Sequence, residues 1–343
     1  MQLLNTLYVT LPDSYLRLDN DTLRVVDAYG ETWLRVPLHH LQSVVCFGNV
    51  GLSAGLMHRL AEDGKSLVLL SSNGRFKARL EGGVSGNVLL RRAQHRAVDD
   101  AVLTLDLART LVAGKLHNQR QTLLRGARET TDQAEVARLT RAAQDLAAGL
   151  RSLPGGADLD TLRGVEGEAA RTYFDALNLI VKADSRPSFQ MDGRTRRPPR
   201  DRMNALVSFL YSMWMNDCRS ALEATGLDPQ LGFLHAVRPG RASLALDLME
   251  EFRPYADRLA LTLINRGQLR AQDFAEREGG AVTLEEAGRK VVVVAYQERK
   301  QEELTHPLLS EKVAFGLVPL VQARLLARFI RREVPAYLPF PMR

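Results

Sequence analysis

The chain has 343 residues, of which 45% are hydrophobic and 25% are charged. This length and balance predict a globular protein with a large core and about two domains. They argue against a membrane-spanning protein, because the most apolar stretch, VVVVAY from Val291, is far shorter than the roughly 20 apolar residues that cross a bilayer. The N-terminal sequence has no basic segment followed by a clear cleavage site, so we expect no secretory signal.

Charge and cysteine content bear on partners and compartment. Lysine and arginine together number 46 against 40 acidic residues, which gives a net charge of +6. So modest an excess favours a polyanionic partner only where the basic groups cluster. Cys46 and Cys218 lie far apart in apolar sequence, which predicts buried free thiols and a reducing, cytoplasmic location.

The first ninety or so residues predict a small β-rich domain. Five short segments rich in β-branched and aromatic residues alternate with turn sequences, as strands do. These segments are LLNTLYVT, SYLRLDN, TLRVVDA, TWLRVPL and SVVCFG. A short helix is expected over residues 53–62. It is followed by a hairpin over residues 65–80 that turns at Asn73-Gly74.

Helical periodicity replaces the strand pattern from residue 92 onward. Residues 92–151 are rich in Ala, Leu and Arg, and Pro154-Gly155-Gly156 ends this region. Further helices are predicted over residues 164–182, 203–224, 241–252, 284–303 and 308–332. The predicted fold class is therefore α+β, with a β-rich N-terminal domain over residues 1–91 and a larger all-α catalytic domain over residues 92–343.

The segment GVEGEAARTYFDALNLIV, residues 164–181, places a carboxylate on an apolar helix face. Glu166 lines up with Tyr173 and Leu177 at helical spacing, whereas Glu168 falls on the polar side. A carboxylate on a buried face is costly unless a cation or hydrogen-bond donors compensate it. Two interpretations of Glu166 stay open: an ion pair with an arginine, or a ligand of a metal ion.

The segment LGFLHAVRPGRASLALDLMEEFRP, residues 231–254, joins an imidazole to a helix with acids. His235 has apolar neighbours, so it is either a hydrogen-bonded core residue or a ligand. The acids Asp247, Glu250 and Glu251 lie opposite the apolar face of the helix. A solvated face explains Asp247 and Glu251, whereas Glu250 lies at the border of the apolar face.

One imidazole and two carboxylates would form an oxygen-rich site that suits Mn²⁺ or Mg²⁺, and the imidazole favours manganese. No GxxxxGK[ST], HExxH, GxSxG or GxGxxG motif occurs in a supporting context. NTP binding, zinc hydrolysis, serine hydrolysis and dinucleotide binding are therefore disfavoured.

Residues 186–202 are rich in arginine. The arginines are Arg186, Arg194, Arg196, Arg197, Arg200 and Arg202. Glycine and three prolines argue against a helix here, and Asp201 is expected to cap the helix that begins near Met203. The segment is either a solvated loop or a set of guanidinium groups that grip a phosphodiester backbone.

Taken together, several stretches resemble one family, the CRISPR-associated endonuclease and spacer integrase that is the first of the two adaptation proteins. The stretches include LLNTLYVTLPDSYLRLD, GNVLLRRAQ, EGEAARTYF, RRPPRDRMNALVSFLYS, GFLHAVRPGRASLALDLMEEFRP and GRKVVVVAYQERKQEELTHP. They span the chain in order, and the longer ones look like the subtype I-C branch.

The resemblance implies a ligand set that periodicity left open. The family's metal ligands fall on Glu166, His235 and Glu250, with Asp247 as a weaker rival to Glu250. Candidate DNA contacts are Arg196, Arg197, Arg200, Arg238 and Arg241. For Arg238 and Arg241, a structural ion pair with Glu250 or Glu251 is an equal alternative.

The resemblance also implies partners and a reaction. We expect a homodimer, formed through the N-terminal domain, that binds double-stranded DNA together with the small second adaptation protein. The expected reaction is attack of a DNA 3′-hydroxyl on a phosphodiester of the CRISPR array, with hydrolysis when water replaces that hydroxyl. Alternative hypotheses are a metal-dependent nuclease for branched DNA in repair and a non-enzymatic DNA-binding scaffold.

Overall fold

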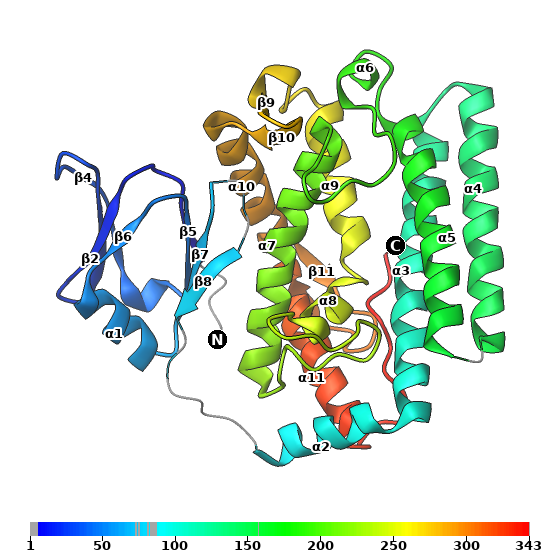
Figure 1. Ribbon diagram of the computed structural model, residues 1–343, viewed down its shortest axis with the longest axis horizontal. Helices are drawn as coiled ribbons and strands as arrows, with labels where there is room; N and C mark the ends of the chain where they lie inside the picture. The colour runs from blue at the N-terminus through cyan, green and yellow to red at the C-terminus, as the bar shows by residue number, and fades with distance from the viewer. Residues whose placement is uncertain are drawn as a thin grey trace. The chain divides into compact units, whose positions relative to one another are not determined.

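The computed structural model describes residues 6–72, 74, 76–80, 82, 88–156 and 158–342 (Figure 1). The backbone divides into two compact units, the first formed by Met1–Ser85 with Glu286–Glu302 and the second by Gly86–Glu285 with Glu303–Arg343. The predicted domain limits of 1–91 and 92–343 stay a prediction. The first compact unit differs from them by taking in a helix from late in the chain.

Two four-stranded sheets form most of the first unit. Their strands are β1 (Thr6–Val9), β2 (Tyr15–Asp19), β3 (Thr22–Val26), β4 (Thr32–Pro37), β5 (Ser43–Phe47), β6 (Gly51–Leu52), β7 (Ser66–Leu70) and β8 (Phe76–Leu80). One sheet has the order β4-β3-β2-β6, with β6 parallel to β2; the other has the order β1-β5-β7-β8, with β8 antiparallel. Helix α10 (Glu286–Gln301) joins this unit, where Gln297 Nε2 donates to the carbonyl of Thr6 over 2.7 Å.

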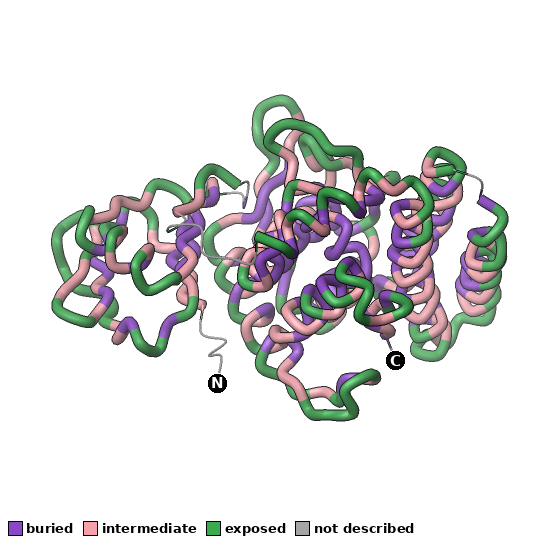
Figure 2. The backbone as a smooth tube through the Cα atoms, turned by 90° about the horizontal axis from the view of Figure 1, so that it is seen from below, coloured by how far each residue is buried: buried purple, intermediate pink, exposed green. Residues whose placement is uncertain are grey.

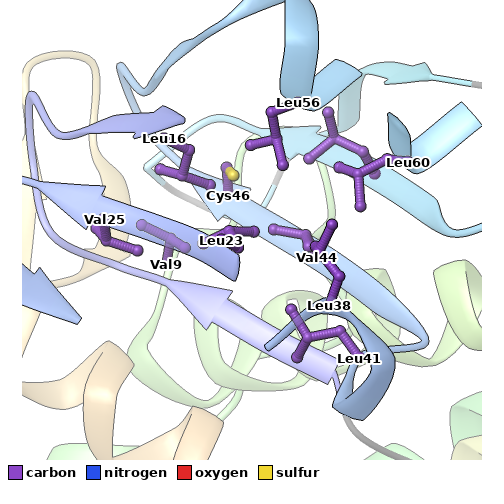
Figure 3. Close-up of a cluster of buried hydrophobic side chains, with 11 residues drawn as sticks. Val9, Leu16, Leu23, Val25, Leu38, Leu41, Val44, Cys46, Leu56 and Leu60 are labelled. Atoms are coloured by element: carbon purple, nitrogen blue, oxygen red, sulfur yellow. The ribbon is translucent and has the colours of Figure 1, made fainter. Parts of the chain in front are cut away.

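The core of the first unit follows directly from the strand and helix periods. Leu16 and Leu23 on β2 and β3 are fully buried, as are Leu56 and Leu60, one turn apart on helix α1 (Ala54–Glu62) (Figure 3). Cys46 lies in the same cluster as a free thiol, so its predicted burial is confirmed. Burial raises the pKa of this thiol to about 12, which keeps it protonated and unreactive.

The strand predictions are confirmed element by element. All five predicted strands are present, and the predicted helix is present with Ser53 as its N-cap. β7 and β8 form the predicted hairpin. Asn73, which was predicted to lie in its turn, is outside the described residues. β6 was missed, because two residues carry no alternation.

The second unit is mainly helical. Its helices are α2 (Val88–Asp99), α3 (Ala101–Glu129), α4 (Gln133–Ser152), α5 (Leu159–Leu177), α6 (Arg186–Phe189), α7 (Arg202–Thr225), α8 (Ser243–Met249), α9 (Arg253–Asn265) and α11 (Val318–Ile330). Two short hairpins, β9 (Phe274–Arg277) with β10 (Ala281–Leu284) and β11 (Glu303–Thr305) with β12 (Lys312–Ala314), correct the prediction that this part is all-α.

Aspartate caps fix where the long helices begin. Asp100, Asp132, Asp158 and Asp201 each accept a hydrogen bond from a backbone N–H in the first turn of α3, α4, α5 and α7. The predicted cap at Asp201 is confirmed. The first two caps also explain why the helical region predicted over residues 92–151 is three helices rather than one.

Two other helix predictions were wrong at their ends. The helix predicted over residues 241–252 is shorter, and a second helix, α9, which carries Pro254 in its first turn, was not predicted. The last predicted helix begins ten residues late, at Val318, because β12 precedes it.

The arrangement of α3, α5, α7, α8 and α9 positions the candidate site. Helices α3, α4 and α5 lie side by side, and α7 packs against α8, α9 and α11 (Figure 1). Buried residues alternate with partly buried and exposed ones along the helices, and exposed residues gather in the outer loops (Figure 2). None of the helices in the described part of the chain is both long and apolar enough to cross a membrane.

Candidate metal centre

The three predicted ligands converge on one place in the second unit. Glu166 comes from the middle of α5, His235 from the loop between α7 and α8, and Glu250 from the residue that ends α8. His235 Nε2 lies 3.8 Å from Glu250 Oε1, and both carboxylates contact the same ammonium group. Residues up to 84 positions apart in the chain therefore lie close together, as the ligands of one ion must.

That ammonium group belongs to Lys115 on α3, a residue the sequence analysis missed. Its Nζ forms an ion pair with Glu166 Oε1 and lies 2.8 Å from Glu250 Oε2. The Lys115 side chain is 6% exposed, so the pair is well shielded from water. A signal existed in the sequence, because Lys115 continues the apolar stripe of Leu107, Leu111 and Leu123 on α3.

Glu250 is buried and held by cations. Arg253, one turn further along the chain, donates from Nε to Glu250 Oε1 over 2.8 Å. Burial raises the pKa of this carboxyl, but Arg253, Lys115 and then His235 outweigh it, so the pKa of Glu250 lies below its usual range. Glu250 is therefore ionised at neutral pH, as a metal ligand must be.

Asp247 orients His235. Its carboxylate accepts hydrogen bonds from the backbone N–H groups of Phe233, Leu234 and His235 at 2.6, 3.0 and 2.9 Å, and lies 2.6 Å from His235 Nδ1. Because a carboxylate only accepts, Nδ1 carries the proton and Nε2 is left as the lone-pair nitrogen on the side of Glu250. The prediction of a solvated Asp247 was wrong, since its side chain is fully buried.

Two further contacts hold the loop that carries His235. Gln94 on α2 donates to the carbonyls of Asp228 and Leu231 and accepts from the N–H of Asp228. Gly232 passes so close to α8 that an added Cβ would lie 2.8 Å from Asp247 Oδ2. A side chain at this position would therefore push the loop away from Asp247.

Glu251 is also buried rather than solvated, against prediction, but it does not belong to the site. Its carboxylate accepts from Tyr337 Oη over 2.5 Å, from Gln322 Nε2 over 3.0 Å and from the N–H of Phe340. It thus ties the C-terminal residues to the end of α8. A helix as short as α8, covered by α3, α7 and α11, has no solvated face.

The donor set fits a divalent cation. Two carboxylates and one oriented imidazole nitrogen are ligands that Mn²⁺ accepts. Glu250 Oε2 is buried, and the cation that it contacts is the ammonium group of Lys115 at 2.8 Å. No group of three His, Cys, Asp or Glu side chains within the described ranges is gathered closely enough to hold an ion without some rearrangement, because Lys115 lies between the carboxylates.

The candidate DNA-binding arginines differ in their surroundings. Arg196, Arg197 and Arg238 are exposed, whereas Arg200 donates to the carbonyl of Gly279 over 2.7 Å. Arg241 is partly buried, and its pKa is lowered, first by burial and then by Arg238, despite an opposing effect of Asp247. Arg197 and Arg163 lower it further, so neighbouring arginines contribute a positive potential at Arg241.

Among the described residues, neither Arg238 nor Arg241 forms the alternative ion pair with Glu250 or Glu251. The arginine that pairs with Glu250 is Arg253. The remaining arginines of residues 186–202 have structural partners. Arg186 pairs with Glu135, Arg194 donates to Asn204 and Ser208, and Arg202 donates to the carbonyl of Ser188.

Comparison with known proteins places this geometry in a family. The family model described as "CRISPR associated protein Cas1" matches residues 7–298. A CRISPR-associated endonuclease Cas1 of Moorella thermoacetica is 53% identical, and one of Chlorobaculum tepidum 47% identical, each over 99% of both chains. These matches do not distinguish subtypes, so the subtype I-C assignment stays a prediction.

Solved structures share the fold. A casposase bound to integration product aligns with a TM-score of 0.83 at 20% identity, over 98% of this chain and 93% of that one. A Cas6-RT-Cas1–Cas2 complex aligns with a TM-score of 0.84 at 23% identity, over all of this chain and 37% of that one. The α+β fold class, with a strand-rich region followed by a mostly helical one, is confirmed, and a CAS1 protein from Thermotoga maritima shares it.

We expect Asp247→Asn to lower the free energy of unfolding by about 2–4 kcal/mol, because an amide group would turn one N–H donor toward donors that now meet a carboxylate. Urea unfolding at pH 7 measures this. The matched control is Asp145→Asn on the exposed side of α4, where the change should be within about 0.5 kcal/mol. Equal losses for the two variants would contradict the role given to Asp247.

Glu251 should make stability depend on pH. Burial raises its pKa to about 7, although Tyr337, Phe340 and Gln322 oppose the rise. The folded protein therefore holds a proton that the unfolded chain releases near its ordinary value, and stability is lost as the pH rises between these two values. Between pH 5 and pH 8, the free energy of unfolding of wild type should fall by about 2–3 kcal/mol more than that of Glu251→Gln. The prediction is wrong if the difference in stability between the two proteins is the same at both pH values.

Proposed function

The chain belongs to the CRISPR-associated Cas1 family, and from this premise we propose that it is a metal-dependent DNA endonuclease and integrase of CRISPR adaptation. The observation that carries the proposal is that Glu166 and Glu250 contact one ammonium group, while His235 Nε2 lies 3.8 Å from Glu250 Oε1. Relatives over the whole chain are named endonucleases, and a structure with the same fold is bound to an integration product.

In the proposed reaction, the 3′-hydroxyl of a DNA fragment attacks a phosphodiester phosphorus of the CRISPR array. A new P–O bond forms, the bond to the original 3′-oxygen of the array strand breaks, and that oxygen leaves with the proton that the attacking hydroxyl gives up. Water in place of the hydroxyl gives hydrolysis. A bound Mn²⁺ or Mg²⁺ would lower the pKa of the nucleophile and neutralise charge that develops on the phosphate.

The protein residues supply position and charge. Glu166 and Glu250 would hold the ion through carboxylate oxygens, and His235 through Nε2, while Asp247 keeps the imidazole in the required tautomer. Arg253 keeps Glu250 ionised and fixed. Arg197, Arg238 and Arg241 would contact phosphate groups of the DNA backbone, which the shared positive potential around Arg241 attracts.

We further propose that the protein acts as a homodimer on double-stranded DNA, together with the small second adaptation protein. Two solved Cas6-RT-Cas1–Cas2 complexes contain a chain with this fold, and they support an assembly with the small partner. Requirements for free 3′-ends and for the small partner would separate integration from a repair nuclease, which should cleave branched DNA alone.

Glu166→Gln and Glu250→Gln should each reduce strand transfer with Mn²⁺ by about a hundredfold or more, because both remove a charged ligand of the ion. The substrate is a fragment with free 3′-ends, and the partner protein is included. Glu168→Gln is the matched control, since it removes an exposed carboxylate two residues away on the same helix, and it should keep the wild-type rate.

The same variants test the scaffold hypothesis. Mn²⁺ should raise the melting temperature of wild type and of Glu168→Gln, and should raise that of Glu166→Gln much less. Wild-type strand transfer by folded Glu166→Gln, or no Mn²⁺-dependent stabilisation of the wild type, would refute the proposed metal site.

The double substitution Arg197→Ala, Arg238→Ala should weaken binding of duplex DNA. It should also reduce the slope of log affinity against log salt concentration by about one to two, because each phosphate contact releases counter-ions. Fluorescence anisotropy at several salt concentrations measures both effects. Arg128→Ala is the control, since Arg128 is exposed and lies about 20 Å along α3 from Lys115. An unchanged salt slope in the double variant would contradict the assignment.

A further inference from the structure

We propose that Lys115 is a built-in competitor of the metal ion: its ammonium group and a divalent cation bind the same two carboxylates, and one exchanges for the other. The inference rests on the proposed function, because it concerns the same site. It adds a residue outside the ligand set, and it gives that residue a role in setting the metal affinity.

Competition follows from the contacts of the carboxylate oxygens. Lys115 Nζ contacts Glu166 Oε1 and lies 2.8 Å from Glu250 Oε2, and Arg253 Nε already takes Glu250 Oε1 at 2.8 Å. An Mg²⁺ ion bonded to Glu166 and Glu250 together would approach their carboxylate oxygens to about 2.0–2.1 Å, and Glu250 Oε2, the oxygen that Arg253 leaves open, is the one that Lys115 Nζ contacts. The ammonium group cannot stay at its present contacts while that happens.

Of the two cations on Glu250, Lys115 is the one able to leave. Arg253 lies one turn from Glu250 and is 10% exposed, and its guanidinium group stacks 4.6 Å from the ring centre of Tyr211. Tyr211 is fixed in turn by a 2.8 Å hydrogen bond to the buried Asp257. Lys115 has a flexible four-carbon side chain, and within the described part of the chain its ammonium group contacts the two candidate ligands, so a rotation about its side-chain bonds frees them.

The charge balance gives the exchange a consequence. Lys115 and Arg253 together match the charges of Glu166 and Glu250, so the buried group is neutral. Removal of Lys115 alone would leave two nearby carboxylates with one cation, which is costly at a buried site. A divalent ion in place of the ammonium group restores compensation and adds one positive charge, which suits a phosphodiester.

Metal affinity tests the inference without relying on catalysis. Lys115→Met keeps the length of the side chain and removes the charge, and it should bind Mn²⁺ about tenfold more tightly or better by isothermal titration calorimetry. Without added metal its melting temperature should lie below that of wild type.

Lys115→Arg keeps the charge and can form two hydrogen bonds to a carboxylate, so it should bind Mn²⁺ more weakly than wild type. Arg109→Gln, six residues before Lys115 on α3 and bonded to Asp106 and to the carbonyl of Gly156, should leave the affinity unchanged.

The outcomes separate this inference from the proposed function. Folded Lys115→Met with an Mn²⁺ affinity equal to or below that of wild type would overturn the inference alone, provided that wild-type binding depends on Glu166 and His235. If Lys115→Met does not fold, Lys115→Arg decides: an affinity equal to wild type or higher overturns the inference. Absence of Mn²⁺ binding by both wild type and Lys115→Met would overturn the proposed metal site together with it.

Discussion

Compensation of two carboxylates, the buried Glu250 and the partly buried Glu166, is the constraint on which the second unit depends. Glu166 and Glu250 come from helices distant in the chain, and their charges are matched by Lys115 on α3 and Arg253 on α9. Burying an unmatched charge costs more than most single contacts contribute, so these four elements can pack only where all four groups meet. Electrostatics therefore fixes the relative placement of α3, α5, α8 and α9 at this point, and hydrophobic packing around it supplies the driving force.

A second layer of buried polar groups turns this constraint into orientation. Asp247 converts three backbone N–H groups and one imidazole nitrogen into a single rigid arrangement. Gln94 fixes the preceding loop from the other side. Because these groups are satisfied by one another and shielded from water, the direction of the imidazole is set by the fold rather than by a ligand. A preorganised nitrogen binds an ion without a further loss of side-chain entropy.

Local pattern predicted the strands and the helix caps, because alternation and capping are short-range effects visible within a few residues. It failed for Asp247 and Glu251, which were assigned to a solvated face. An amphipathic pattern presumes one wet side, and α8 has none because three helices cover it. Family resemblance, not periodicity, led to the set of Glu166, His235 and Glu250. Lys115 was overlooked because a lone lysine in an apolar stripe becomes informative only once its distant acidic partners are known.

The arginines at the surface and the acids of the candidate site carry opposite charges. Under the proposed function, the arginines would attract DNA and the acids would hold the ion. Lys115 and Arg253 leave the group of Glu166 and Glu250 neutral, so under the proposed function the attraction for a DNA backbone would have to come from other residues. The proposed phosphate contacts Arg197, Arg238 and Arg241 would supply this attraction at the surface. The pKa of the partly buried Arg241 is lowered first by burial and then by repulsion from neighbouring arginines, Arg238 foremost. A phosphate between them would relieve that repulsion. Both effects on Arg241, burial and neighbouring positive charge, would thus favour an anion beside its guanidinium group.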